Sequence, residues 1–274
     1  MERRIVVSGG NELRTFSLPQ LCPLQRVCLE GAGPLAAGGD ALYCACNPGG
    51  AIWRLSPDTL MPQALFFGGP GVCALALSAD GRRLHALCGE GDSVLMLDAA
   101  GGQPLMLARA GVNPQGFCLC GDTLAVAGGE SAALLLLEEE TLALRAQIPM
   151  PGPVMAAALS PGGAYALCLS ETLASIFVSA DQSGLRKMGL TGLPGALAAA
   201  QGGVYAATDG RLYTCREGGI GVPLQRNAPG RAGRIVCIGG RLFLCDAYGG
   251  GLFSLSGGGC WKRICMHALD VAEL

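Results

Sequence analysis

Charged side chains and histidine are scarce in this 274-residue chain. Asp, Glu, Lys and Arg together make up 15% of it, against a usual quarter in globular proteins, and there are only two histidines. The formal net charge is −2, which provides no basic surface for nucleic acid or for an anionic membrane. We therefore expect neither of these as a partner.

The chain also has no segment typical of a signal peptide or a membrane helix. Residues 1–10 contain no apolar core of signal-peptide length, which favours a cytoplasmic protein with reduced cysteines. If an export signal was removed, disulfides among the fourteen cysteines return to consideration. Two uncharged windows, Ala146–Ser170 and Met188–Thr208, are long enough to cross a bilayer, but both contain proline and paired glycines. We expect no membrane span.

Signatures of catalysis, metal binding and cofactor binding are missing as well. There is no G-x-S-x-G nucleophile motif and no C-x-x-C pair. Gly31–Ala36 fits G-x-G-x-x-A, but Pro34 and the following Gly38–Asp40 leave no helix to hold a pyrophosphate. The C-x-C pairs Cys44/Cys46 and Cys118/Cys120 are interpreted as packing residues. The sequence predicts no cofactor and no metal, and it identifies no catalytic residue.

Glycine and short apolar runs, in contrast, are abundant and recur at an even spacing. The chain has 44 glycines, and half of its residues are hydrophobic. One run occurs seven times, and the last residues of successive copies are 37, 42, 40, 40, 40 and 38 positions apart. The copies are Ile5–Gly9, Leu42–Cys46, Leu84–Cys88, Leu124–Gly128, Ala164–Cys168, Val204–Thr208 and Leu242–Asp246. A period near forty residues indicates a repeat architecture.

The stretch Gly71–Ala110 shows the content of one repeat most clearly. Its runs Val72–Leu77, Leu84–Cys88, Val94–Leu97 and Leu105–Ala108 are too short for helices and are separated by turn residues. Four antiparallel strands in each of seven units predict an all-β, single-domain, seven-bladed β-propeller. The expected blades are 1–32 with 267–274, then 33–70, 71–110, 111–151, 152–192, 193–230 and 231–266.

The two ends of the chain predict how the ring closes. The first unit lacks its first strand, and residues 267–274 form one strand too many at the C-terminus. We expect this C-terminal strand to pair beside Ile5–Gly9 in the N-terminal blade, which removes two open sheet edges.

Four short segments resemble the YVTN-type propeller repeat. They are Ser78–Gly81, Ser93–Asp98, Asn113–Gly116 and Ser160–Gly163. The resemblance implies the WD40/YVTN-like superfamily, which includes surface-layer propellers, lactonase-like propellers and the propeller subunit of quinohemoprotein amine dehydrogenase. It fixes the fold better than the activity. Trp-Asp dipeptides are absent, which counts against WD40 repeats themselves.

Polar residues on one predicted face of the ring form the candidate binding site. Loops from second to third strands and loops between blades share this face. Six blades place a carboxylate there and the remaining one has Asn47; the carboxylates are Glu12, Glu90 with Asp92, Glu130, Glu171, Asp209 and Asp246. The loops between blades add Arg109, Asn113, Gln115, Arg231 and Arg234, and His267 is expected near the channel mouth. The carboxylates suit a cation and the arginines an anionic group. The alternative is that these residues are ordinary turn formers on solvated loops.

Three further groups are expected to be structural. His85 lies within a second strand and is predicted to pack in the interior or between blades. Cys46, Cys88 and Cys168 share one repeat position that takes a small residue. Glu138–Glu140 falls on a turn of the opposite face, where we expect solvated side chains.

Two functions remain open from the sequence. The first is a non-catalytic binding or scaffold propeller that holds a small ligand or a protein partner at its channel mouth. The second, implied by the resemblance alone, is a lactonase-like hydrolase that uses the charged mouth with a bound divalent cation. Neither the substrate nor the oligomeric state can be derived from this chain.

Overall fold

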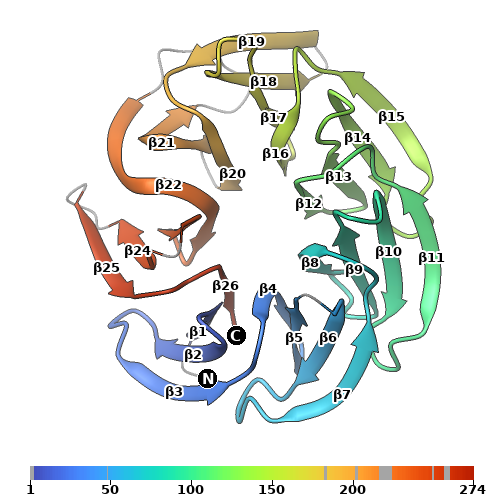
Figure 1. The fold of residues 1–274 in the computed structure, drawn as a ribbon, viewed down its shortest axis with the longest axis vertical. Helices are drawn as coiled ribbons and strands as arrows, with labels where there is room; N and C mark the ends of the chain where they lie inside the picture. The colour runs from blue at the N-terminus through green and yellow to red at the C-terminus, as the bar shows by residue number, and fades with distance from the viewer. Residues whose placement is uncertain are drawn as a thin grey trace.

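The computed structural model is a ring of twisted β-sheets around a central channel (Figure 1). It describes residues 3–47, 49–181, 184–200, 203–215, 224–248, 250–255 and 260–274. All regular elements in these ranges are strands, β1 to β26. None of the described residues belongs to a helix that could span a membrane.

Five of the sheets have four antiparallel strands, as the repeat predicts. The first contains β26 (Asp270–Glu273), β1 (Arg4–Gly9), β2 (Glu12–Ser17) and β3 (Pro23–Cys28). The second contains β4 (Ala32–Gly38), β5 (Ala41–Cys46), β6 (Ala51–Leu55) and β7 (Pro62–Phe67). The third contains β8 (Val72–Leu77), β9 (Arg83–Cys88), β10 (Ser93–Asp98) and β11 (Pro104–Arg109).

The next two sheets follow the same order from the channel outwards (Figure 1). The fourth contains β12 (Gly116–Cys120), β13 (Thr123–Ala127), β14 (Ala133–Glu138) and β15 (Leu144–Pro149). The fifth contains β16 (Val154–Ser160), β17 (Gly163–Leu169), β18 (Ser175–Asp181) and β19 (Gly184–Leu190).

The last sheet differs from the prediction. It has six strands: β20 (Pro194–Ala200), β21 (Gly203–Cys215), β22 (Leu224–Ile238), β23 (Arg241–Asp246), β24 (Leu252–Leu255) and β25 (Trp261–Cys265). The predicted units 193–230 and 231–266 share it, because β22 runs from one into the other without a break and pairs with both β21 and β23. The predicted count of seven blades is therefore corrected to six.

Strand β21 is long because it contains the turn of a hairpin. Gly210 has a φ of +70°, and a Cβ placed on Gly203 would lie 2.8 Å from the carbonyl oxygen of Cys215. The two ends of β21 are thus side by side, which a straight 13-residue strand does not allow. The Asp209–Gly210 turn explains why β21 covers two strand positions of the repeat, one on each side of the turn.

The ring closes as the sequence predicts. Strand β26 pairs antiparallel with β1, and Ile5 lies opposite Glu273 while Ser8 lies opposite Asp270. The observed strand covers residues 270–273, so the first three residues of the predicted segment 267–274 precede it. Strand β26 is the strand of the first sheet nearest the channel (Figure 1).

The hydrophobic core lies between successive sheets. Most buried clusters join residues of two neighbouring sheets, as Tyr43 and Ile52 of the second sheet do with Val72 and Leu84 of the third, and one lies within the six-stranded sheet. Second strands are almost entirely buried, whereas outer strands such as β11 are largely exposed. The predicted small-residue position is confirmed, since Cys46, Cys88 and Cys168 are all buried.

Candidate ligand-binding site

Irregular pairing of the inner strands shapes one end of the channel. The register between first and second strands shifts at similar points in β4, β8, β16, β20 and β22. A bulge leaves one residue unpaired and re-aims its side chain. Three of these irregular segments line the channel mouth, at Gly33–Pro34, Cys73 and Gly233.

Two adjoining cavities occupy this mouth. The first has a volume of about 470 Å³ and is lined by Asn47, Cys73, Gln115, Arg234 and Asp270, among others. The second, of about 420 Å³, shares Asn47, Cys73 and Gln115 with the first and adds Glu90 and Asn113. The structure thus brings together five of the predicted residues: Asn47, Glu90, Asn113, Gln115 and Arg234.

Arg234 and Asp270 form an ion pair in the first cavity. The Nε of Arg234 lies 3.1 Å from Oδ1 of Asp270, and this charge raises the pKa of the guanidinium. Asp270 is itself held in place, because it accepts hydrogen bonds from the backbone N–H groups of Leu35 (2.9 Å) and Val271 (2.8 Å). The guanidinium is therefore permanently charged and ion-paired with an anchored carboxylate, although its Nε forms no hydrogen bond within the described part of the chain.

The terminal nitrogens of Arg234 have no acceptor among the residues that the structure describes. A planar guanidinium whose Nε is held by one carboxylate can still offer its outer edge to a second anionic or carbonyl group. Asn47 and Gln115 add amide groups beside it, although Asn47 also donates to the carbonyl of Val72 (3.1 Å). The first cavity is suited to a small ligand with a hydrogen-bond acceptor.

Cys73 is in contact with water at the mouth but is not a nucleophile at neutral pH. Protein surrounds its thiol, and this burial raises its pKa to about 11. The Sγ lies 3.5 Å from the carbonyl oxygen of Leu87, which the protonated thiol serves as a donor. Because the thiolate is the reactive form, the mouth lacks an activated cysteine.

The other predicted residues line neither cavity. Asp92 and Glu130 instead hold Asn113: Oδ1 of Asp92 accepts from its backbone N–H (2.7 Å), and Oε1 of Glu130 accepts from its side-chain amide (3.3 Å). Arg231 donates to the hydroxyl of Tyr248 and to the carbonyl of Pro194, both at 3.1 Å. The remainder lie outside both linings: Arg109, Glu171, Asp209, Asp246 and His267.

Glu12 departs most from its predicted role as a solvated loop carboxylate. It begins β2, is 3% exposed, and forms ion pairs with Arg14 and Arg26. Its carboxylate is neutralised within the first sheet and is unavailable to a ligand at the mouth. The predicted convergence of carboxylates therefore reduces, at these cavities, to Glu90 and Asp270.

Glu139 is a second correction. It is 4% exposed, although a solvated side chain is predicted for residues 138–140. It accepts two hydrogen bonds from Arg83, from Nε (2.9 Å) and a terminal nitrogen (2.7 Å), and its carbonyl oxygen lies 3.2 Å from Nε2 of His85. The predicted interior position of His85 is confirmed, since its side chain is fully buried between the third and fourth sheets.

Asp270 and Cys73 were not predicted as mouth residues. Both lie on inner strands. Asp270 is the single charged residue within the otherwise apolar Ala268–Ala272 of the closing strand, and this could have indicated a functional position. Cys73 carried no such signal, because its exposure depends on the bulge between Val72 and Ala74. Within the described ranges, no three His, Cys, Asp or Glu side chains are grouped as metal ligands.

Comparison with solved structures identifies the fold. A protein of unknown function from Desulfotomaculum acetoxidans superimposes with a TM-score of 0.80 at 11% identity, over 98% of this chain and 100% of that one. Hydrazine synthase from Kuenenia stuttgartiensis gives 0.70 at 14% identity, over 82% and 76% of the two chains. BamB from Moraxella catarrhalis gives 0.62 at 12% identity, over 89% and 78%.

These likenesses, all below 25% identity, show a β-propeller and nothing of its activity. No protein-family model and no curated protein matches the chain. The YVTN-type repeat therefore stays a prediction from the sequence.

Proposed function

We propose that this protein is a non-catalytic binding propeller that holds a small anionic ligand at its channel mouth. One observation carries the proposal: Arg234 is ion-paired with Asp270 beside a cavity of about 470 Å³, and its terminal nitrogens have no protein acceptor among the described residues. Pockets of this size, with a few convergent polar groups, suit small molecules.

The polar groups around Arg234 support an anionic ligand over a cationic one. Asp270 is already paired with Arg234, and Glu12 is paired with two arginines in the first sheet. Among the described residues, this leaves Glu90, in the adjoining cavity, as the mouth carboxylate that forms no ion pair. A hydrogen bond to a charged group contributes about 1.5–3 kcal/mol, so one missing guanidinium contact predicts a loss of affinity of tenfold or more.

The absence of an activated thiol at the mouth supports a binding role over nucleophilic catalysis. The protonated Cys73 packs against backbone carbonyls and contributes shape to the cavity wall. A YVTN-type repeat, if the chain has one, is compatible with this role.

The test is calorimetric titration of the protein with acetate, citrate and inorganic phosphate, and with spermidine as a cationic probe. We expect saturable binding of at least one anion and a tenfold or greater loss of its affinity in Arg234→Lys. Lysine keeps the charge beside Asp270 but loses the planar fork, so the variant should remain folded.

Arg109→Gln is the matched control, because Arg109 lies on the same predicted face but lines neither mouth cavity. Its affinity for the anion should equal that of the wild type. An anion affinity that is unchanged in Arg234→Lys, or tighter binding of spermidine than of every anion, contradicts the proposal.

A further inference from the structure

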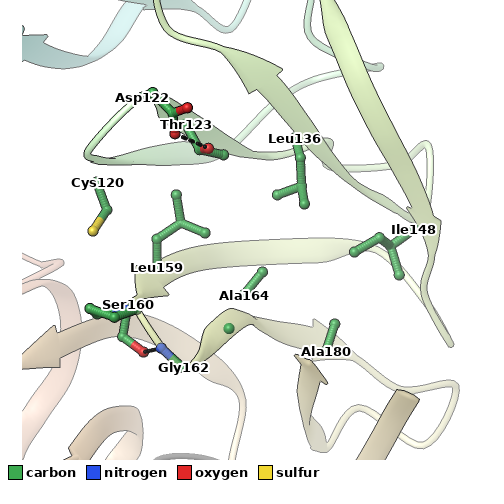
Figure 2. Close-up of a pocket in the computed structure, with 12 residues that line it drawn as sticks. Cys120, Asp122, Thr123, Leu136, Ile148, Leu159, Ser160, Gly162, Ala164 and Ala180 are labelled. Atoms are coloured by element: carbon green, nitrogen blue, oxygen red, sulfur yellow. Dashed lines mark hydrogen bonds between the residues drawn. The ribbon is translucent and has the colours of Figure 1, made fainter. Parts of the chain in front are cut away.

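A third cavity, separate from the two at the mouth, lies at the opposite end of the ring. It measures about 940 Å³ and separates the fourth sheet from the fifth (Figure 2). Leu136 and Ile148 come from the fourth sheet, and Leu159, Ala164 and Ala180 from the fifth. Turns between first and second strands, Cys120–Thr123 and Ser160–Gly163, border it, whereas second-to-third loops and loops between blades border the mouth. We call this cavity the interblade cleft.

One repeat position explains why the cleft exists. The second residue of each second-strand run is directed towards the following sheet, and it is large in most copies: Val6, Tyr43, His85, Ala125, Tyr165, Tyr205 and Phe243. Tyr43 spans its junction fully, since its hydroxyl donates to the carbonyl of Ala99 at 2.7 Å. The fourth sheet has Ala125 at this position; its methyl group is fully buried in one cluster with Ala164 and is too short to reach the cleft, which Ala164 lines.

A pair of alanines on the facing sheet enlarges the gap. Where the second and third strands pair, the third sheet has two leucines that pack on the preceding sheet, Leu84 opposite Leu97. Leu124 opposite Leu137 repeats this arrangement in the next sheet. The fifth sheet instead pairs Ala164 with Ala180, and both line the cleft. Three small residues therefore meet at one junction.

From this geometry we propose that the interblade cleft binds a small aromatic molecule that carries a hydrogen-bonding group. The other junctions of the protein indicate which groups fit such a space, because the same repeat position holds a phenol ring in Tyr43 and Tyr165 and an imidazole in His85. The cleft wall provides apolar contacts at Leu136 and Leu159 and a hydroxyl at Ser160. A ring with one polar edge matches both kinds of contact.

The charged groups at the cleft's rim favour a free small molecule over a protein partner. Arg145 pairs with Asp122 (3.0 Å) and with Glu138 (3.1 Å), and Asp122 also accepts from the hydroxyl of Thr123. Each of these three charged side chains is already engaged with another, so a protein partner would have to break these contacts to use their net charge of −1. The proposal is independent of the anion site at the mouth.

The probe for the test is p-cresol, the side chain of tyrosine, in ¹³C-methyl NMR titrations of the full chain. We expect saturable shifts of the Leu136, Ile148 and Leu159 methyl signals, with weak affinity because the probe is small. Cyclohexylmethanol, which has similar size but no aromatic ring, should bind at least severalfold more weakly. Equal binding of the two probes overturns the aromatic assignment.

Variants that refill the cleft from within provide the decisive comparison. Ala125→Tyr and, separately, Ala180→Leu should each weaken p-cresol binding tenfold or more, because the added side chain occupies the ligand's space. If one variant fails to fold, the other still decides. Leu107→Ala, at an exposed position of β11 far from the cleft lining, is the control and should bind p-cresol as the wild type does.

Two other outcomes overturn the proposal. One is the absence of any saturable shift with p-cresol in the wild type, and the other is unchanged binding in both refilled variants. A capped tyrosine tripeptide is the arm that tests a protein partner. If it binds more tightly than p-cresol and loses affinity in Ala125→Tyr, the small-molecule assignment is wrong.

Discussion

The junction between the third and fourth sheets and the junction between the fourth and fifth are built on the same repeat but end in opposite states. At the first, His85 and Arg83 reach across to Glu139, which is buried between them. At the second, the equivalent residues are Ala125 and Thr123, and a cavity of about 940 Å³ remains (Figure 2). The side chains at these two positions of the second strand thus determine whether neighbouring sheets pack closely or leave a cleft between them.

The sealed junction depends on a charge that has been removed from water. A buried ion pair is weak evidence for stability as a whole, but loss of one partner leaves the other uncompensated. Glu139 is that partner here, since two hydrogen bonds to Arg83 and the contact with His85 converge on it. The open junction has no comparable dependence, because its charged residues lie at the exposed rim.

The largest effect on stability is expected when the carboxylate of Glu139 is removed from the junction between the third and fourth sheets. Glu139→Ala should lower the free energy of unfolding by roughly 3 kcal/mol, because Arg83 loses its acceptor, whereas the backbone carbonyl beside His85 remains. Urea denaturation followed by circular dichroism measures the change. Glu140→Ala is the control: its carboxylate is exposed and lies 3.4 Å from Arg83, so no resolvable change is expected. Equal losses in the two variants would show that Glu139 is no more important than a surface charge.

A smaller effect of opposite sign is expected when the open junction is filled. Ala125→Tyr should raise the free energy of unfolding by about 0.5–2 kcal/mol, as cavity-filling substitutions commonly do. The matched control is Ala127→Leu in the same strand, at a fully buried position with no adjoining cavity, which should destabilise by about 1–3 kcal/mol. Thermal unfolding distinguishes the two signs, and a destabilised Ala125→Tyr would contradict the account of the cleft.

The two junctions should also differ in their response to pH. Burial lowers the pKa of His85 below its ordinary value, with the neighbouring Glu139 acting in the opposite sense. As the pH falls below about 6.5, the unfolded chain therefore takes up a proton that the folded state does not. Stability should decline between pH 7 and pH 5, by at most about 1.4 kcal/mol per pH unit.

A variant isolates the contribution of His85 to that decline. His85→Tyr places at the sealed junction the residue found in the second and fifth sheets, and it has no group that titrates in this range. The difference in unfolding free energy between wild type and variant should shrink or reverse as the solution is acidified from pH 7 to pH 5. A constant difference across these pH values would rule out His85 as the origin.

The repeat made most of the fold predictable. Apolar runs bounded by glycine turns specified the strands, and the surplus strand at the C-terminus specified how β26 meets β1. The count of separate blades failed at residues 227–230, although Asn-Ala-Pro-Gly is a sequence typical of turns. Arg231 and Arg234 were predicted on a loop between blades, yet both lie within β22, where Arg231 pairs with Asp209 and Arg234 with Cys245.

The candidate site was predictable only in part, for a physical reason. Loop positions such as Glu90 and Asn113 follow from the repeat, and the structure brings them to the mouth. Burial of a charge, in contrast, depends on what the neighbouring blade offers. Glu12 is buried because Arg14 and Arg26 flank it, and Glu139 because Arg83 lies opposite in the next sheet. Such pairings between separate segments leave no periodic trace in the sequence.

The pairing of β26 with β1 has a consequence for how the protein is made. Ile5 and Glu273 are partners across almost the whole chain, so the loop closed by this contact is the longest in the molecule. During synthesis, β1 keeps one edge unpaired until residues 270–273 leave the ribosome, and such an edge invites pairing with other chains. Ring completion should therefore be the slow, concentration-sensitive step of folding.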